Sequence, residues 1–169
     1  MKSLTDVRLE LREAQDPISL CNSLVNENVA YAADEVLWQQ ADYWETPKEA
    51  FEKGADCEGI ALTKMFLLSE CGIRAERLLL LSGNCPVGAH MVLAIFPDLL
   101  ILDNRTDFIV SLEKKTSFQP LWGISLSKLF YWFSKRKIAF MSTTIPIPEW
   151  FDVLHRYQNE TYPLQIEDK

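Results

Sequence analysis

The chain has 169 residues, is 48% hydrophobic and 24% charged, and carries a formal net charge of −7. Its length and composition are those of one soluble globular domain with its own core, and no apolar run reaches the roughly 20 residues that span a bilayer. The 17 Lys and Arg residues, against 24 Asp and Glu, argue against a general nucleic-acid binder, which needs a basic face to neutralise phosphates.

The first residues and the cysteines bear on the cellular compartment. MKSLTDVRLELREAQDP alternates charge with leucine and has no apolar stretch like that of a signal peptide, so we expect a cytoplasmic protein as the sequence stands. Removal of a native leader would leave the same sequence, and the protein would then be periplasmic. The absence of a CxxC pair argues against structural zinc, and a disulfide framework is not expected in a chain of this size without an export signal. The four cysteines are Cys21, Cys57, Cys71 and Cys85.

Apolar residues recur at helical spacing in the first part of the chain. It predicts one or two helices within residues 18–38. Thr46, Pro47 and Glu49 form a capping box with proline at the first helical position, and they predict a short helix over residues 47–53.

The longest predicted helix covers residues 57–71. Apolar residues occupy most of its circumference, so we expect it to be buried on most sides. Gly54 can end the preceding helix, and Gly72 is placed to cap the C-terminus of this one.

The pattern then changes to short apolar runs bounded by Gly, Pro, Asn and Asp. These runs predict strands over residues 77–82, 90–96 and 99–103, and a fourth strand that includes residues 108–110. Only Pro97-Asp98 separates the second strand from the third, which predicts an antiparallel hairpin. Helices followed by strands indicate an α+β fold, with an antiparallel sheet packed on a central helix.

The C-terminal part, residues 121–169, is expected to be helical. Helices are predicted over residues 125–136 and 148–158, the second with proline in its first turn. We interpret Lys135-Arg136-Lys137 as the solvated end of the first helix, in preference to a binding patch. Aromatic residues in this part are either core or a surface for a partner protein. They are Trp122, Tyr131, Trp132, Phe133, Trp150 and Phe151.

Three residues suggest a nucleophilic site. Cys57 begins the long helix, where the helix dipole lowers a thiol pKa and unpaired N–H groups can hold an oxyanion. His90 begins one strand of the hairpin and Asp103 ends the other, so both should lie at its open end, within reach of a hydrogen bond. A thiol, a base and a carboxylate that orients the base are the parts of a catalytic triad.

Each of these residues also has an ordinary interpretation. Cys57 taken alone is a small half-buried residue, His90 a histidine with its hydrogen bonds satisfied, and Asp103 a turn former before an asparagine. The second histidine, His155, lies in the helical stretch VLHRYQ, and we interpret it as a surface residue.

Four blocks of the chain carry a resemblance to a known family. They are LVNENVAYAAD, DYWETPKEAFEKGADCEGIALTKMFLLSECGI, AHMVLAIF and LLILDN. In this order they are similar to the bacterial transglutaminase-like cysteine proteinases, over residues 24–120. The resemblance implies one domain over residues 1–169 with a papain-like, transglutaminase-type fold, in which a central helix carries the nucleophile.

The resemblance also implies roles for individual residues. Cys57 would be the nucleophile, His90 the general base and acid, and Asp103 the carboxylate that orients His90. Trp44 or Tyr43, just before the nucleophile block, would wall the cleft, unless they are core aromatics. The reaction would be acyl transfer from an amide through a thioester, usually to water, and its chemistry needs no cofactor.

Calcium enters through the same resemblance. The nucleophile block of the family often reads Asp-Cys-Glu-Asp, and its carboxylates are linked to calcium binding. Here the block reads Asp56, Cys57, Glu58, Gly59, so the last carboxylate is missing. Calcium prefers six to eight oxygen ligands, so we expect a weakened site formed by Asp56 and Glu58.

The leading functional hypothesis is a cysteine peptidase that acts on a protein substrate, with a regulatory protein partner as a further expectation. The same thioester would also serve a deamidase, a transglutaminase or an amidase. A third interpretation, from a different class, is a catalytically idle binding module on the same scaffold.

Overall fold

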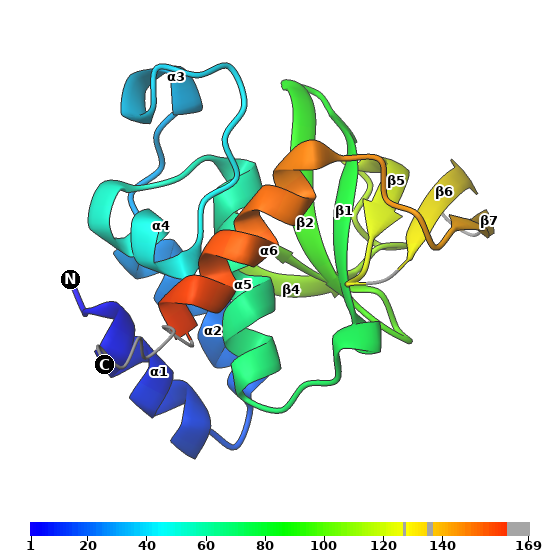
Figure 1. Cartoon of the computed structure of the whole chain (residues 1–169). Helices are drawn as coiled ribbons and strands as arrows, with labels where there is room; N and C mark the ends of the chain where they lie inside the picture. Colours follow the sequence, from blue (N-terminus) through cyan, green and yellow to red (C-terminus); the bar gives the residue numbers. More distant parts are fainter. Residues whose placement is uncertain (127, 135–136, 162–169) are drawn as a thin grey trace, which may run out of the picture.

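Helices gather on one side of an antiparallel sheet in the computed structural model (Figure 1). The structure describes residues 1–126, 128–134 and 137–161, with the backbone alone for 131–134 and 137–141. The helices are α1 (Leu4–Glu13), α2 (Pro17–Asn28), α3 (Asp34–Leu37), α4 (Pro47–Lys53), α5 (Cys57–Glu70), the 3-10 helix η1 (Ala75–Arg77) and α6 (Pro148–Thr161). The strands are β1 (Leu78–Cys85), β2 (Gly88–Ile95), β3 (Leu100–Asp103), β4 (Thr106–Ser111), β5 (Gln119–Ile124), β6 (Leu129–Ser134) and β7 (Lys137–Ser142). They form one sheet in the order β4-β3-β2-β1-β5-β6-β7.

Helix α5 lies at the centre of the fold because apolar residues cover most of its circumference. Every residue from Gly59 to Leu68 is buried. Helices α2 and α4 and strands β1 and β2 all pack against it. Helix α6 also reaches it, since Phe66 stacks on Tyr157 with ring centroids 4.0 Å apart. The predicted long buried helix is confirmed, and so is the short helix before it, which is α4 with its capping box at Thr46.

The middle of the sheet is buried on both faces. Leu78 and Leu80 of β1 belong to the core between the sheet and the helices, whereas Leu79 and Leu81 belong to a smaller core on the opposite face. A strand that alternates between two cores needs apolar side chains at every position. This explains why the run Arg77-LLLL-Ser82 shows no polar alternation.

Strands β2 and β3 form the predicted antiparallel hairpin. Leu93 pairs with Leu102, and Ile95 pairs with Leu100 across the turn. The fourth predicted strand is also confirmed, as β4. The α+β class is thus confirmed, and the hairpin places His90 and Asp103 at the same end of the sheet.

The helix predicted over residues 125–136 is wrong. Residues 129–134, LFYWFS, form β6, which pairs with β5 on one side and β7 on the other. Aromatic residues favour strands, and the neighbouring strand β5 offers free backbone partners, so sheet pairing outweighs the helical spacing. Lys135 and Arg136, interpreted as a helix end, lie outside the described residues, and Lys137 begins β7. The last predicted helix is confirmed as α6.

Helix α1 was not predicted, although its N-terminus carries a local signal. Ser3 caps it by accepting a hydrogen bond from the backbone N–H of Asp6, whose carboxylate accepts one from Ser3 in return. Val7 and Leu11 are its buried residues. Within the described residues, no helix combines the length and the apolar character needed to cross a membrane.

Candidate active site

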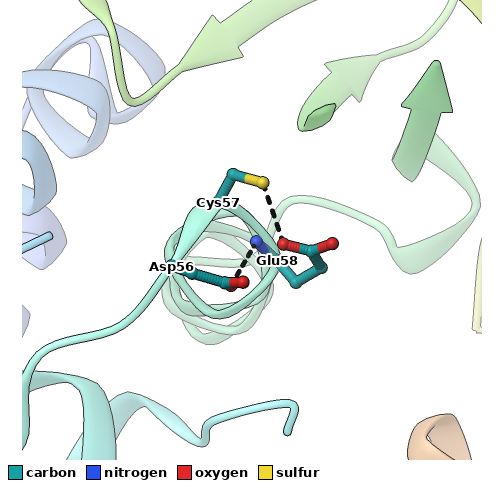
Figure 2. A group of neighbouring side chains, drawn as sticks. All are labelled: Asp56, Cys57 and Glu58. Atoms are coloured by element: carbon teal, nitrogen blue, oxygen red, sulfur yellow. Dashed lines mark hydrogen bonds between the residues drawn. The ribbon is translucent and has the colours of Figure 1, made fainter. Parts of the chain in front are cut away.

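Cys57 is the first residue of α5, and the chain leading into it is held on both sides. Ala55 pairs with the segment after α2, donating its N–H to the carbonyl of Ala30 (3.0 Å) and accepting one from Ala32 (3.1 Å). Asp56 then caps the helix, because its carboxylate accepts hydrogen bonds from the N–H groups of Glu58 (2.9 Å) and Gly59 (3.4 Å). Figure 2 shows the capping carboxylate and the thiol at this helix start.

The Cys57 thiol rests against a carboxylate. Its Sγ donates to Oε2 of Glu58 at 2.8 Å (Figure 2). Burial raises the pKa of this thiol, and the negative charge of Glu58 raises it further, while the backbone N–H of Met91 acts in the opposite direction. The lowered pKa expected from the helix dipole alone is therefore not what this arrangement shows. The cause is that Glu58, next in the sequence, turns its charge toward the sulfur.

His90 and Asp103 form a buried pair. Their side chains are 1% and 3% exposed, and Nε2 of His90 lies 2.8 Å from Oδ1 of Asp103. The backbone N–H of Arg105 donates to the same oxygen (3.0 Å), and Lys115 Nζ lies 2.7 Å from Oδ2. Burial alone would raise the pKa of Asp103, but the hydrogen bonds from His90 and Lys115 outweigh burial and hold the pKa well below its ordinary range.

The second ring nitrogen of His90 takes no part in this pair. Nδ1 is buried and has no hydrogen-bond partner among the described residues. Met91, the next residue, meets the Cys57 sulfur through its backbone N–H. The structure thus brings Cys57 to the residue beside His90, and it brings His90 onto Asp103.

Helix α2 anchors the turn that carries Asp103. Asn26 Nδ2 donates to the backbone carbonyl of Asp103 (3.0 Å), and Asn22 Nδ2 donates to that of Thr106 (3.0 Å). These asparagines, together with Lys115, are supporting residues that sequence reasoning missed. No local sequence pattern identifies them, because each contacts a residue that is far away in the sequence.

The two aromatic residues proposed for the cleft lie in different surroundings. Trp44 is 4% exposed and packs edge-on against Trp150 in the main core, the alternative foreseen for it. Tyr43 stacks on Trp38 at 4.2 Å and lines a cavity of about 240 Å³ together with residues of the start of α6. His155 is exposed on α6, far in sequence from the His90–Asp103 pair, as expected for a surface residue.

The remaining aromatic residues of the C-terminal part divide in the same way. Trp150 is buried and Trp122 is half-buried against the main core, whereas Phe151 is 57% exposed on α6. The side chains of Tyr131, Trp132 and Phe133 lie outside the described part of the structure.

Beside the helix start lies a cluster of carboxylates. Asp34, Glu45 and Asp56 each place one oxygen within 4.8 Å of the others. Oδ1 of Asp34 and Oε2 of Glu45 are buried and receive no hydrogen bond from a described donor. Burial raises the pKa of Glu45 to about 8 and that of Asp56 to about 9. Carboxylate oxygens that face one another without donors suit a hard cation such as calcium, which was expected here at Asp56 and Glu58.

The profile of the bacterial transglutaminase-like cysteine proteinases matches residues 2–134. Calcium-bound Legionella pneumophila LapG matches with a TM-score of 0.73 and 24% identity, over 89% of this chain and 85% of that chain. EGTA-treated LapG and a further LapG structure each match with a TM-score of 0.69 and 20% identity, over 93% of this chain and 98% of theirs. A search of curated proteins finds no match.

The family match runs from α1 to the end of β6 and includes all three residues singled out in the sequence, Cys57, His90 and Asp103. The structural matches show that the fold is the transglutaminase-like one that the sequence predicts. Because the profile covers well over half of the chain, the protein belongs to the bacterial transglutaminase-like cysteine proteinases, and it is a cysteine protease.

Proposed function

We propose that this cysteine protease cleaves its protein substrate with Cys57 as nucleophile, His90 as general base and acid, and Asp103 as the group that orients His90. The observation that carries this proposal is the buried His90–Asp103 pair, with Nε2 bound at 2.8 Å and Nδ1 unpartnered, next to the residue that meets the Cys57 sulfur. An imidazole held by one nitrogen presents the other in a defined direction, which is what a general base needs.

The resting state is a neutral thiol that donates to Glu58. For reaction, the proton of Cys57 goes to Nδ1 of His90, and Sγ attacks the carbonyl carbon of the scissile amide. Backbone N–H groups at the first turn of α5 stabilise the oxyanion. His90 then returns the proton to the leaving amine, which departs and leaves a thioester on Cys57.

Hydrolysis of the thioester follows the same steps, with water as the nucleophile. His90 takes a proton from the water molecule, the hydroxide attacks the thioester carbon, and Cys57 leaves as thiolate and recovers the proton from His90. Asp103 stabilises the imidazolium in both halves, and its lowered pKa keeps it ionised throughout. The chemistry is completed by side chains and water, without a cofactor.

The test is proteolysis of a complex protein mixture. A bacterial lysate is incubated with the wild-type chain, with Cys57→Ala and with His90→Ala, and new protein N-termini are identified by mass spectrometry. We expect new N-termini with the wild-type chain alone. Equal sets of N-termini for all three proteins would refute the proposal. Substrate glutamines that gain about one mass unit, or new crosslinks, without cleavage would instead indicate the deamidase or transglutaminase use of the same thioester.

A further inference from the structure

A cavity adjoins the His90–Asp103 pair at the end of the sheet where two turns meet. One turn joins β1 to β2 and the other joins β3 to β4. Because β2 lies antiparallel between β1 and β3, both turns are at the same end of the sheet. The cavity has a volume of about 240 Å³, enough for one amino-acid side chain, and its lining includes Cys85, Val87, His90, Asp103, Arg105 and Lys115.

Arg105 brings an exposed positive charge to the wall of this cavity. Its guanidinium donates a hydrogen bond to Sγ of Cys85 at 3.0 Å, and this Sγ donates to the carbonyl of Gly88 at 3.2 Å. The thiol that makes both contacts carries its proton and does not neutralise the guanidinium. No carboxylate of the described residues forms an ion pair with the Arg105 side chain. Sulfur is a weak acceptor, so Cys85 orients the guanidinium and leaves most of its five donors for a better acceptor.

The charge of Arg105 sets the sign of the cavity. Asp103 is the one carboxylate among the described residues that line it. Lys115 Nζ lies 2.7 Å from Oδ2 of Asp103, so the negative charge of Asp103 already has a buried counter-charge. The guanidinium is the remaining charge on the wall, and a carboxylate that enters the cavity is attracted to it.

The position of the cavity relative to the catalytic residues indicates which part of a substrate reaches it. His90 gives its proton to the leaving amine in the proposed reaction, so the chain after the scissile bond must pass His90. His90 lines the cavity, whereas Cys57 is not among the described lining residues. The cavity therefore lies on the leaving-group side of the nucleophile.

Two charges near the nucleophile act on an acidic substrate residue in opposite directions. The hydrogen bond to Cys85 is the main cause that raises the pKa of Arg105, and a Cys57 thiolate raises it further, so Arg105 is within electrostatic reach of the nucleophile. Glu58 lies against the Cys57 sulfur at 2.8 Å and repels a substrate carboxylate placed beside the scissile carbonyl. An acidic residue is thus favoured in the cavity and disfavoured at the sulfur.

We propose that this cavity is a subsite for an acidic side chain of the substrate, within about three residues after the scissile bond, and that Arg105 binds its carboxylate. The carboxylate accepts two parallel hydrogen bonds from the guanidinium and replaces the weaker contact with Cys85. The backbone N–H of Arg105 holds Asp103, so a change of the Arg105 side chain leaves that contact in place. The identity of the ligand as a substrate residue rests on the proposed function, whereas the binding of a carboxylate does not.

The first experiment measures the cleavage preference on a peptide library made from a bacterial proteome. New N-termini are identified for the wild-type chain, Arg105→Gln, Arg105→Glu and the control Arg74→Gln, which removes an exposed arginine from the opposite end of β1. We expect Asp and Glu to be enriched about two- to fivefold over background in the three positions after the cleaved bond, since partly exposed ion pairs are weak. Arg105→Gln should lose the enrichment, Arg105→Glu should favour Lys and Arg instead, and Arg74→Gln should match the wild-type chain.

Two results of this experiment would overturn the proposal. One is cleavage by the wild-type chain without enrichment of Asp and Glu, or with the same enrichment in Arg105→Gln. The other is cleavage confined to the last residues of the peptides, which would mean that the cavity binds a C-terminal carboxylate and not a side chain.

The second experiment needs no proteolysis. The hydrogen bond from Arg105 lowers the pKa of Cys85, so this thiol can be labelled near neutral pH. Iodoacetate carries a carboxylate and iodoacetamide does not, and the ratio of their rates at one thiol is independent of its thiolate population. Peptide mass spectrometry gives this ratio at Cys85 in the wild-type chain and in Arg105→Gln, with Cys71 as the internal reference.

We expect the iodoacetate to iodoacetamide ratio at Cys85 to be at least about threefold higher in the wild-type chain than in Arg105→Gln, with no change at Cys71. Equal ratios at Cys85 in both chains would show that Arg105 does not bind a carboxylate and would overturn the proposal. A wild-type chain that cleaves no peptide refutes the proposed function, and the ratio at Cys85 then still decides whether the cavity is a carboxylate site.

Discussion

Replacing Glu58 with Gln should make Cys57 more reactive at neutral pH. The sulfur and Oε2 of Glu58 are 2.8 Å apart, so the carboxylate both accepts the thiol proton and repels a thiolate. Both groups are partly exposed, and two unit charges 2.8 Å apart at an effective dielectric constant of about 40–80 interact by about 1.5–3 kcal/mol. The substitution should therefore lower the thiol pKa by about 1–2 units.

The alkylation rate of Cys57 should increase by a smaller factor than its thiolate population. A pKa lower by about 1–2 units increases the thiolate population at pH 7 about 10- to 100-fold, but a less basic thiolate is a weaker nucleophile, with a Brønsted coefficient near 0.5. We therefore expect alkylation of Cys57 by iodoacetamide to accelerate about 3- to 10-fold. Peptide mass spectrometry separates Cys57 from the other three cysteines.

The matched control is Glu13→Gln, which removes one exposed carboxylate from the end of α1. It should leave the alkylation rate of Cys57 unchanged. A Glu58→Gln chain that is alkylated at the wild-type rate, or more slowly, between pH 6 and pH 8 would refute the inference that Glu58 holds the resting thiol in its neutral form.

Three further predictions concern the buried groups around the site. Asp103→Asn removes the carboxylate that binds Nε2 of His90, so proteolysis should fall by about 10²- to 10⁴-fold with an unchanged circular dichroism spectrum; a fall below tenfold would argue against the orienting role. Lys115→Met removes a cation that keeps the pKa of Asp103 low, so the loss of activity on acidification should begin at higher pH, whereas Lys115→Arg should keep the wild-type profile. Burial lowers the pKa of Lys64 to about 8, so the unfolded chain binds more protons than the folded chain between about pH 8 and 10.5. The wild-type chain should thus gain about 2–3 kcal/mol relative to Lys64→Met between pH 7 and pH 10.5, measured by urea unfolding, and a constant difference would contradict the lowered pKa.

The position of Cys57 at a helix start could be predicted from local sequence. Asp56 is a good N-cap, and the apolar run after Cys57 has the length and spacing of a buried helix, so the cysteine had to lie at a helix start. Only two residues separate the predicted strands 90–96 and 99–103, and this predicts a hairpin. The strands of a hairpin lie side by side, so the start of the first strand meets the end of the second. The approach of His90 and Asp103 follows from that geometry.

The partners of these residues could not be predicted, because they lie far away in the sequence. Lys115 follows β4 and reaches back to Asp103, and Glu45 meets Gly59 only after the loop before α4 has folded against α5. The protonation state of the Cys57 thiol also depends on the direction of the Glu58 side chain, which the sequence does not specify. Glu58 could have turned to the solvent or to the carboxylate cluster, and it turns to the sulfur.

The wrong helix prediction for the residues of β6 has a different cause. LFYWFS has aromatic residues at spacings that fit a helix as well as a strand, and short apolar runs of this kind are ambiguous. Pairing with β5 and β7 decides the outcome, and neither neighbour was predicted as a strand. The error does not affect the candidate active site, because His90 and Asp103 lie on β2 and β3, which β1 and β5 separate from β6 in the strand order.

The most direct test of the central claim is whether the reactivity of Cys57 depends on His90. The alkylation rate of Cys57 is measured from pH 5 to pH 9 in the wild-type chain, in His90→Ala and in His155→Ala. The account predicts that His90→Ala slows alkylation at least about tenfold at pH 6–7, because the base that accepts the thiol proton is missing, and that His155→Ala matches the wild-type chain. Equal rates in the wild-type chain and His90→Ala, rising only near the pKa of about 8.5 of an ordinary thiol, would contradict it.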